Sequence, residues 1–107
     1  AKDVKRLGVP AYQWWSEALH GVGSSPGVVF EKPTPFLFLF DVTPSYATSF
    51  PQVSLTSQSF DRQLFRSIAS TISTEARVMS NFGHANLTYW SPNVNIYRGI
   101  RFRSNRA

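Results

Sequence analysis

Apolar residues at helical spacing between residues 61 and 82 form the clearest pattern in the sequence. The residues that recur at steps of one, three and four are Leu64, Phe65, Ile68, Ala69, Ile72, Ala76 and Met79. This spacing is typical of an amphipathic helix. Asp61 stands at its start, where a carboxylate can accept hydrogen bonds from free amides and suits the helix dipole. Gly83 follows the last turn, as a C-terminal cap does, so we predict one helix over residues 61–82.

Three shorter stretches, residues 9–15, 49–56 and 87–90, have the composition of strands. Side chains alternate between the two faces of a strand, so Trp14 and Trp15 would point to opposite sides. One of the two indoles would then need a second apolar neighbour, such as another layer, another domain or a sugar ring. Strand, helix and strand at this spacing predict a βαβ unit with parallel pairing and a right-handed crossover.

The remaining segments predict loops and an incomplete fold. Residues 21–35 are rich in Gly, Pro and Ser and are expected to be a loop, while residues 36–40 are apolar at every position. Such a run is either a fully buried strand or an aggregation-prone segment. Residues 1–8 are expected to be the last turn of a helix that Gly8 ends. One helix and three short strands would leave sheet edges and an apolar face bare, so we predict a piece of a larger α/β fold.

Composition allows one small globular domain at most and narrows the function classes. The 107 residues are 42% hydrophobic and carry 11 Lys and Arg against 6 Asp and Glu, with the basic residues gathered at both ends. Basic ends are typical of nucleic-acid binders, but no such motif accompanies them, so we expect no nucleic-acid partner. No run approaches the about 20 apolar residues of a membrane helix, so no membrane partner is expected. The chain lacks cysteine, which excludes thiolate metal sites, and it begins without Met or a leader, so we expect it to be internal to a longer product.

Glu17 is the most informative candidate for chemistry, because it lies beside Trp14 and Trp15 at the predicted end of a strand. Ligands bind at such ends in α/β folds, although a solvated Glu beside an aromatic strand is the simpler interpretation. Glu17-x-x-His20 has the spacing of one half of a di-iron site, but the other ligands are absent, so no metal or cofactor is predicted. The other acids are Asp3, Glu31, Asp41, Asp61 and Glu75. Glu75 is expected on the helix surface, and no pair of carboxylates suitable for glycosidase chemistry is visible.

Two further motifs are weak. His84 follows the predicted helix cap and is expected in a surface loop, and no Gly-x-Ser-x-Gly elbow supports a triad around it. Asn86-Leu87-Thr88 is a formal N-glycosylation sequon, which is weak support for secretion.

One stretch of the sequence has a rare composition: residues 6–21 end in Tyr-Gln-Trp-Trp-Ser-Glu-Ala-Leu-His-Gly. This stretch resembles the early signature of family 3 glycoside hydrolases, in the β-xylosidase branch typical of plants and fungi. Residues 47–53, 73–77 and 87–98 continue the resemblance. It implies the first βα units of a (β/α)8 TIM barrel, an α/β fold that is incomplete as it stands. It also implies a secreted, cell-wall enzyme that removes terminal β-D-xylosyl or α-L-arabinofuranosyl residues from xylan-derived oligosaccharides with retention.

The same resemblance implies substrate-binding roles for Glu17 and Trp90. In the family, the Glu of the Trp-Ser-Glu-Ala-Leu-His motif binds sugar hydroxyls on the non-reducing side of the scissile bond. The aromatic residue before Pro-Asn-Val-Asn, here Trp90, lines the same pocket. A xylo-oligosaccharide or an arabinoxylan-derived sugar is therefore the expected partner, with no cofactor and no metal.

The departures from the family are as informative as the matches. Residues 28–46 have no good counterpart, so we interpret them as an insert, with translated non-coding sequence as a hypothesis. Residues 99–107 diverge from the family's Asp-Pro-Arg-Trp-Gly-Arg continuation. The nucleophilic Asp and the acid/base Glu of the family lie outside this chain, and we therefore expect no catalytic residue here and an inactive chain. The alternative is a non-catalytic carbohydrate-binding or decoy protein that keeps Glu17 and Trp90.

Overall fold

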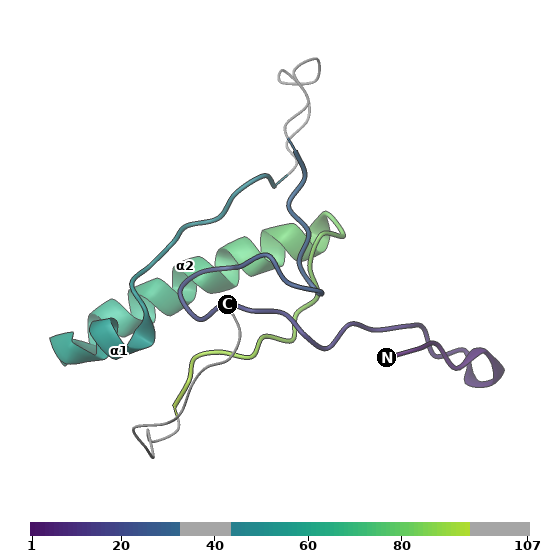
Figure 1. Cartoon of the computed structure of the whole chain (residues 1–107), viewed down its shortest axis with the longest axis horizontal. Helices are drawn as coiled ribbons and strands as arrows, with labels where there is room; N and C mark the ends of the chain where they lie inside the picture. Colours follow the sequence, from purple (N-terminus) through teal and green to yellow (C-terminus); the bar gives the residue numbers. More distant parts are fainter. Residues whose placement is uncertain (33–43, 95–107) are drawn as a thin grey trace, which may run out of the picture.

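The computed structural model describes residues 1–32 and 44–94. Its elements in chain order are the 3-10 turn η1 (Lys5–Leu7), the short helix α1 (Val53–Thr56), the 3-10 turn η2 (Ser57–Ser59) and the long helix α2 (Arg62–Asn81). Figure 1 shows α2 as a single rod, with irregular segments of the chain lying along it. The described part of the chain contains isolated β-bridges but no β-strand.

Helix α2 and both of its caps confirm the prediction from the apolar periodicity. The Asp61 carboxylate accepts hydrogen bonds from the backbone N–H groups of Gln63 at 2.8 Å and Leu64 at 3.1 Å. These bonds satisfy two of the amides that a helix start leaves without an intrahelical partner. At the other end Gly83 has φ of 77°, a left-handed conformation that glycine adopts without a Cβ penalty.

The prediction of three strands is wrong. Residues 49–56 contain α1, in which the backbone N–H of Thr56 donates to the Gln52 carbonyl at 3.0 Å. Residues 9–15 and 87–90 are irregular, apart from a bridge at Val9. Short strands are marginal without neighbours to complete their ladders, and residues 1–32 and 44–94 offer only single bridges. Residues 1–8 hold one 3-10 turn, which Gly8 ends at φ of 65°.

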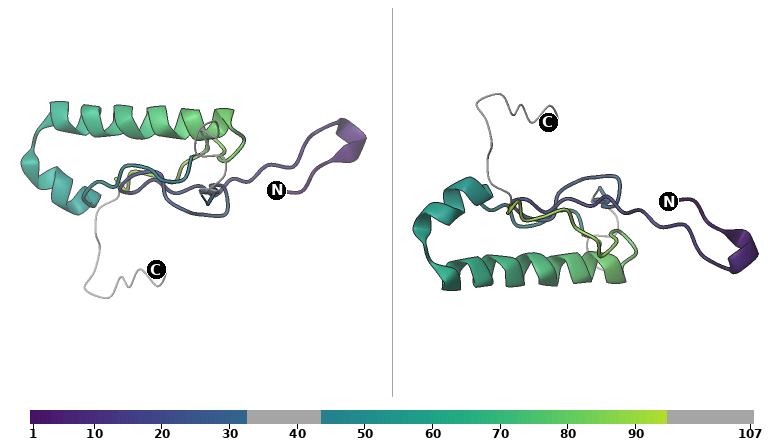
Figure 2. Two further views of the ribbon diagram at one scale, coloured as in Figure 1. Left: turned by 90° about the horizontal axis from the view of Figure 1, so that it is seen from above. Right: turned by 90° about the horizontal axis from the view of Figure 1, so that it is seen from below.

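Two of the three predicted strand segments nevertheless lie side by side and run in the same direction. The Asn86 side-chain amide donates to the Gln13 carbonyl at 3.1 Å, and further along both segments the Trp90 amide donates to the Ser16 carbonyl at 2.9 Å. Figures 1 and 2 show α2 beside these segments, running back along them. The segment that runs beside residues 87–90 is therefore residues 9–15 and not residues 49–56, so this pair differs from the predicted βαβ unit. The α/β assignment and the partial (β/α)8 barrel stay predictions.

The core is small and lies between the C-terminal half of α2 and the loop before residue 32. Its buried apolar residues are Ala18, Val22, Val28, Ala76, Met79 and Ala85. Val28 is 2% exposed and forms a bridge with Ala85, so the loop is irregular, as predicted, yet supplies part of the core. Val28 is also the first residue of the predicted insert, residues 28–46, of which residues 33–43 lie outside the described residues. The divergent tail, residues 99–107, lies outside them as well. No helix in the described ranges is long and apolar enough to cross a bilayer.

Candidate functional site

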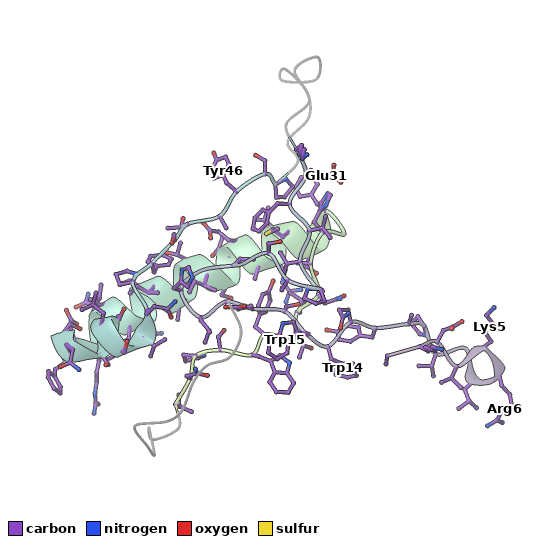
Figure 3. All side chains as sticks on the ribbon, viewed as in Figure 1. Lys5, Arg6, Trp14, Trp15, Glu31 and Tyr46 are labelled. Carbon is purple, nitrogen blue, oxygen red and sulfur yellow. The ribbon has the colours of Figure 1, made fainter. Side chains whose placement is uncertain are left out.

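The candidate site is built where Trp90 is fixed on the residues that precede Glu17. The Trp90 indole N–H donates to the Trp14 carbonyl at 2.9 Å, and its backbone N–H donates to the Ser16 carbonyl, also at 2.9 Å. The Trp90 ring lies 5.1 Å from that of Trp15, centroid to centroid, with an interplanar angle of 37°. Figure 3 shows Trp14 and Trp15 on the segment between the N-terminal turn, marked by Lys5 and Arg6, and α2. The structure therefore brings Trp90 next to Glu17 in space.

Four aromatic side chains form an exposed cluster here, in two contacting pairs. Tyr12 and Trp14 pack edge to face at 4.6 Å, and Trp15 packs on Trp90. Trp14, Trp15 and Trp90 keep exposed fractions of 56%, 44% and 59%. Residues 9–15 are not a strand, yet Trp14 and Trp15 pack on different aromatic partners, and both indoles remain about half exposed. Such a surface can be covered by an apolar partner or by a sugar ring.

Glu17 is held by its backbone, while its carboxylate is left available as an acceptor. The Glu17 carbonyl accepts from the Gly23 amide at 2.9 Å, and the Glu17 amide donates to the Ser25 hydroxyl at 3.2 Å. Within residues 1–32 and 44–94 the Glu17 carboxylate makes no hydrogen bond or ion pair. A fixed backbone with a free carboxylate suits recognition of a ligand that donates hydrogen bonds.

Gly27 and Ser16 determine how closely the loop after residue 21 approaches the segment of Trp15 and Ser16. A Cβ at Gly27 would lie 2.2 Å from the Ser16 hydroxyl oxygen and 2.5 Å from the Trp15 carbonyl oxygen. Ser16 is completely buried, and its hydroxyl has no hydrogen-bond partner among the described residues. The sequence showed Gly27 only as a loop residue, because a close approach between distant segments leaves no local pattern.

His20 does not join Glu17. No helix forms over residues 16–20, so the i, i+3 spacing of the two residues does not place them on one helical face. The His20 ring nitrogen Nδ1 instead lies 3.3 Å from the Ser49 hydroxyl oxygen. The described ranges contain no group of three or more His, Cys, Asp or Glu residues that could hold a metal ion.

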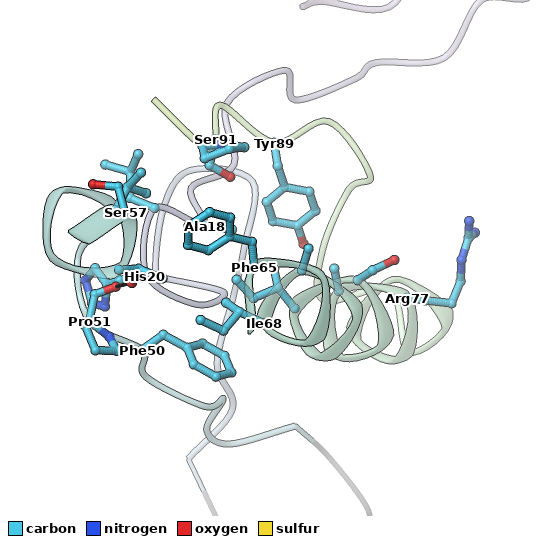
Figure 4. Close-up of a pocket in the computed structure, with 18 of the residues that line it drawn as sticks. Ala18, His20, Phe50, Pro51, Ser57, Phe65, Ile68, Arg77, Tyr89 and Ser91 are labelled. Atoms are coloured by element: carbon cyan, nitrogen blue, oxygen red, sulfur yellow. Dashed lines mark hydrogen bonds between the residues drawn. The ribbon is translucent and has the colours of Figure 1, made fainter. Parts of the chain in front are cut away.

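A second surface, distinct from the aromatic cluster, is an apolar groove of about 540 Å³ between α1, α2 and the segments around residues 19 and 89 (Figure 4). Its apolar lining includes Leu19, Phe50, Phe65, Ile68 and Ile72, with Tyr89 at one side, whereas neither Glu17 nor Trp90 lines it. Tyr89 therefore belongs to the groove, while its neighbour Trp90 belongs to the aromatic cluster.

Tyr89 carries a buried hydroxyl without a hydrogen-bond partner among the described residues. Burial raises the pKa of Tyr89 above its ordinary value, and the nearby Tyr12 raises this pKa further. The phenolate would lose hydration in this position, so the neutral form is favoured.

The packing of α2 corrects the prediction for His84, and it gives Glu75 a bonded partner whose contacts are exposed, as on a helix surface. His84 was expected in a surface loop, but its side chain is 16% exposed and its Nδ1 lies 3.8 Å from a carboxylate oxygen of Glu31. His84 is covered because the loop that contains Val29 packs on the end of α2, where the Val29 amide donates to the His84 carbonyl at 2.8 Å. Glu75, expected on the helix surface, accepts three hydrogen bonds from Thr48.

A sequence signal for Glu75 did exist. Glu75 follows Ile72 by three positions and precedes Met79 by four, so it lies on the same face of α2 as the apolar stripe. A carboxylate that interrupts such a stripe needs a partner from another segment.

Comparison with known proteins gives a consistent set of relatives, although no family model matches the chain. The chain is 50% identical over 99 residues to a Neosartorya fischeri protein named "Probable exo-1,4-beta-xylosidase", matching 92% of this chain and 12% of the relative. It is 50% identical over 103 residues to β-xylosidase/α-L-arabinofuranosidase 2 of Medicago sativa subsp. varia, and 52% identical over 103 residues to β-D-xylosidase 3 of Arabidopsis thaliana. In these two the match covers 95% of this chain and 12% of the relative.

The chain thus spans about 12% of the length of the curated relatives that it matches. Half of the aligned residues are identical over nearly the whole chain, in relatives from a fungus and from two plants. This agreement confirms the resemblance that the motifs around Glu17 and Trp90 indicated: over nearly its whole length the chain is similar to a fragment of proteins named β-xylosidases and β-xylosidase/α-L-arabinofuranosidases.

Proposed function

We propose that this chain forms part of the sugar-binding site of a glycoside hydrolase. In the longer protein it would serve removal of terminal β-D-xylosyl or α-L-arabinofuranosyl residues from xylan-derived oligosaccharides. We further propose that the parent is a secreted cell-wall enzyme of family 3, and that residues 1–107 correspond to the first βα units of its barrel. The names of the relatives support the reaction class.

The observation that carries the proposal is the attachment of Trp90 to the residues before Glu17. Two hydrogen bonds of 2.9 Å hold Trp90 on the Trp14 and Ser16 carbonyls, which fixes an exposed indole on the segment that leads directly into Glu17. A sugar ring presents hydroxyls that donate to a carboxylate, and an apolar C–H face that packs on an indole. The aromatic cluster and Glu17 together offer both kinds of contact.

We propose that the chain by itself does not hydrolyse glycosides. Retaining hydrolysis needs two carboxyl groups about 5 to 5.5 Å apart. Glu17 is the one described acid next to the Trp14 and Trp15 pair in the chain, since Asp3 precedes the turn η1, Asp61 caps α2, Glu75 binds Thr48 and Glu31 lies beside His84. A single carboxylate can bind a sugar, but it cannot act as both nucleophile and acid.

Titration with xylose, followed by tryptophan fluorescence, tests the binding role. We expect xylose to change the emission of the wild-type chain, and we expect Glu17→Gln to weaken binding by about tenfold or more, because a hydrogen bond to a charged group is lost. Glu31→Gln is the matched control, because it makes the same change at a partly exposed carboxylate that lies beside His84. Equal affinities of Glu17→Gln and the wild type would refute the role of Glu17.

Hydrolysis of an aryl β-xyloside tests the catalytic part. We expect no release above background from the purified 107-residue chain, and release above background would overturn the proposed inactivity. The exposed aromatic cluster also favours a second function, that of a carbohydrate-binding or decoy protein. Both functions predict that the isolated chain binds xylose without turnover, so a cooperative thermal transition of the isolated chain is the result that would favour this second function.

A further inference from the structure

We infer that Glu75 is a positioning residue, which fixes the segment that carries Glu17 by clamping Thr48 to helix α2. The inference rests on the proposed function only in that Glu17 is taken as the group that binds sugar. The clamp itself is a set of contacts among Glu75, Thr48 and the turn at residues 20 and 21.

The first step of the clamp joins α2 to Thr48. The two carboxylate oxygens of Glu75 accept from the Thr48 backbone N–H at 3.2 and 3.1 Å, and one of them also accepts from the Thr48 hydroxyl at 2.6 Å. A single carboxylate therefore satisfies both donors of Thr48. Hydrogen bonds to a charged acceptor are shorter and stronger than neutral ones. The segment before α1 has no helix or strand of its own, so this bond set fixes where it runs.

The second step joins Thr48 and its neighbours to the turn at residues 20 and 21. Gly21 has φ of 124°, and a Cβ there would lie 2.0 Å from the Thr48 carbonyl oxygen, so the two backbones are in direct contact. The Phe50 amide donates to the His20 carbonyl at 2.6 Å, and the Ser49 hydroxyl lies 3.3 Å from Nδ1 of His20. Residues 48–50 are thus docked along the turn at three successive positions.

The third step joins the turn to Glu17. The Glu17 carbonyl accepts from the Gly23 amide at 2.9 Å, and Leu19 and Gly21 form a bridge, so residues 17–23 fold back on themselves as one unit. Displacing residues 48–50 would release one side of this unit. Contiguous contacts of this kind can carry coupling from the Glu75 carboxylate to the Glu17 backbone, although the two side chains do not touch.

Amide hydrogen exchange on the full 107-residue chain tests the clamp directly. The informative amide is that of Phe50, which bonds to His20 and has no contact with Glu75. In Glu75→Ala we expect this amide to exchange about tenfold faster than in the wild type, while the Met79 amide within α2 keeps its rate. In Glu75→Gln, which retains the size and one acceptor oxygen, the Phe50 exchange rate should lie between those of Glu75→Ala and the wild type. In Glu31→Gln it should equal the wild-type rate.

Two results would overturn the clamp. One is an unchanged Phe50 exchange rate in Glu75→Ala. The other is an equal acceleration at Phe50 and Met79, because Glu75 would then stabilise the chain as a whole. If Glu75→Ala does not fold, Thr48→Val decides, since it removes the 2.6 Å bond and keeps the amide, whereas Thr48→Ser should restore wild-type exchange.

Xylose titration of the same variants tests the link to Glu17. We expect Glu75→Ala to lower the affinity for xylose several-fold, and Thr48→Val in the Glu75→Ala background to add little, because the two residues act through one contact. Unchanged affinity with faster Phe50 exchange would overturn the positioning role. If the wild-type chain binds no xylose, the proposed sugar site fails, and hydrogen exchange alone still decides whether the clamp exists.

Discussion

At the residue scale, two glycines decide how closely the segments around Glu17 approach one another. Gly21 lies on the Thr48 carbonyl with a left-handed backbone, and Gly27 lies on Ser16 and the Trp15 carbonyl. Neither position has room for a side chain. A Cβ added at Gly23, in the same loop, would lie 3.7 Å from the Glu17 carbonyl oxygen, which is an ordinary van der Waals distance.

We therefore expect Gly21→Ala and Gly27→Ala to lower the free energy of unfolding by about 2 kcal/mol or more, through steric overlap and, at Gly21, backbone strain. Gly23→Ala should change it by less than about 1 kcal/mol. Urea denaturation followed by tryptophan fluorescence measures all three variants. Equal effects of Gly27→Ala and Gly23→Ala would contradict the close packing on Ser16.

Tyr89 offers a prediction about pH. Its pKa is raised by burial, so the unfolded chain loses the phenol proton at lower pH than the folded chain does. Stability is therefore unaffected by this group below the unfolded value of about 10, and falls as pH rises from there through the folded pKa. Tyr89→Phe should remove this part of the alkaline loss and cost little at neutral pH, because the hydroxyl has no partner.

The exposed Tyr46 provides the control for Tyr89, since it is 85% exposed. Denaturation curves at neutral and alkaline pH compare the two variants with the wild type. If Tyr46→Phe reduces the alkaline loss as much as Tyr89→Phe does, burial of Tyr89 is not the cause.

At the element scale, local interactions specify α2 from end to end, more fully than any other element in residues 1–32 and 44–94. Its apolar stripe, the Asp61 cap and Gly83 agree with one another, and this consistency is why the helix could be predicted. The absence of strands could not be predicted, because a strand is stable only beside partner strands, and a local pattern does not show whether such partners are present. Residues 49–56 also contain bonds from Thr56 and Leu55 to the Gln52 carbonyl, which favour the α1 turn.

The cap gives the element-scale prediction. Asp61→Ala leaves two amides of α2 without their acceptor, so we expect it to lower the free energy of unfolding by about 1 kcal/mol. Asp61→Asn keeps an acceptor oxygen and should lower the free energy of unfolding by less, mainly through loss of the interaction between the Asp61 charge and the helix dipole. Far-UV circular dichroism in urea measures both. An Asp61→Ala chain as stable as Asp61→Asn would contradict the role of the cap.

At the scale of the whole molecule, the described part of the chain buries few apolar side chains and leaves many large ones exposed. Six small or medium apolar residues are buried, while large side chains such as Leu64, Phe65 and Phe82 are more than a third exposed along α2. The groove of about 540 Å³ lies open between α2 and its neighbours. Hydrophobic burial is the main favourable term in folding, so we expect low stability of the isolated chain.

An open apolar groove predicts binding of a hydrophobic dye. We expect the folded chain to enhance the fluorescence of anilinonaphthalene sulfonate, and Phe65→Asp, which places a charge in the groove, to reduce the enhancement at least about twofold. Phe60→Asp is the control, because Phe60 is 87% exposed and does not line the groove. An equal reduction in both variants would mean that the dye binds to scattered exposed residues.

The sequence predicted part of the candidate site and could not predict the rest. Glu17 and Trp90 were singled out by motifs, and the structure holds Trp90 on the carbonyls of Trp14 and Ser16, while the sugar-binding roles of Glu17 and Trp90 stay predictions. The roles of Glu75, Thr48, Gly21 and Gly27 were not predicted, because each depends on a contact between segments far apart in the chain. His84 was misjudged for the same reason, since the residue that faces it, Glu31, lies before the long helix.

By itself the sequence determined the features that depend on neighbours within a few positions. These are the length and caps of α2, the turn that Gly8 ends, the irregular loop after residue 21, and the family motifs around Glu17 and Trp90. Tertiary structure decided which backbones touch and which polar groups are satisfied. The position of Glu75 in the apolar stripe signals that it needs a partner, but nothing local identifies Thr48 as that partner, because the meeting of the two segments is set by packing of the whole chain.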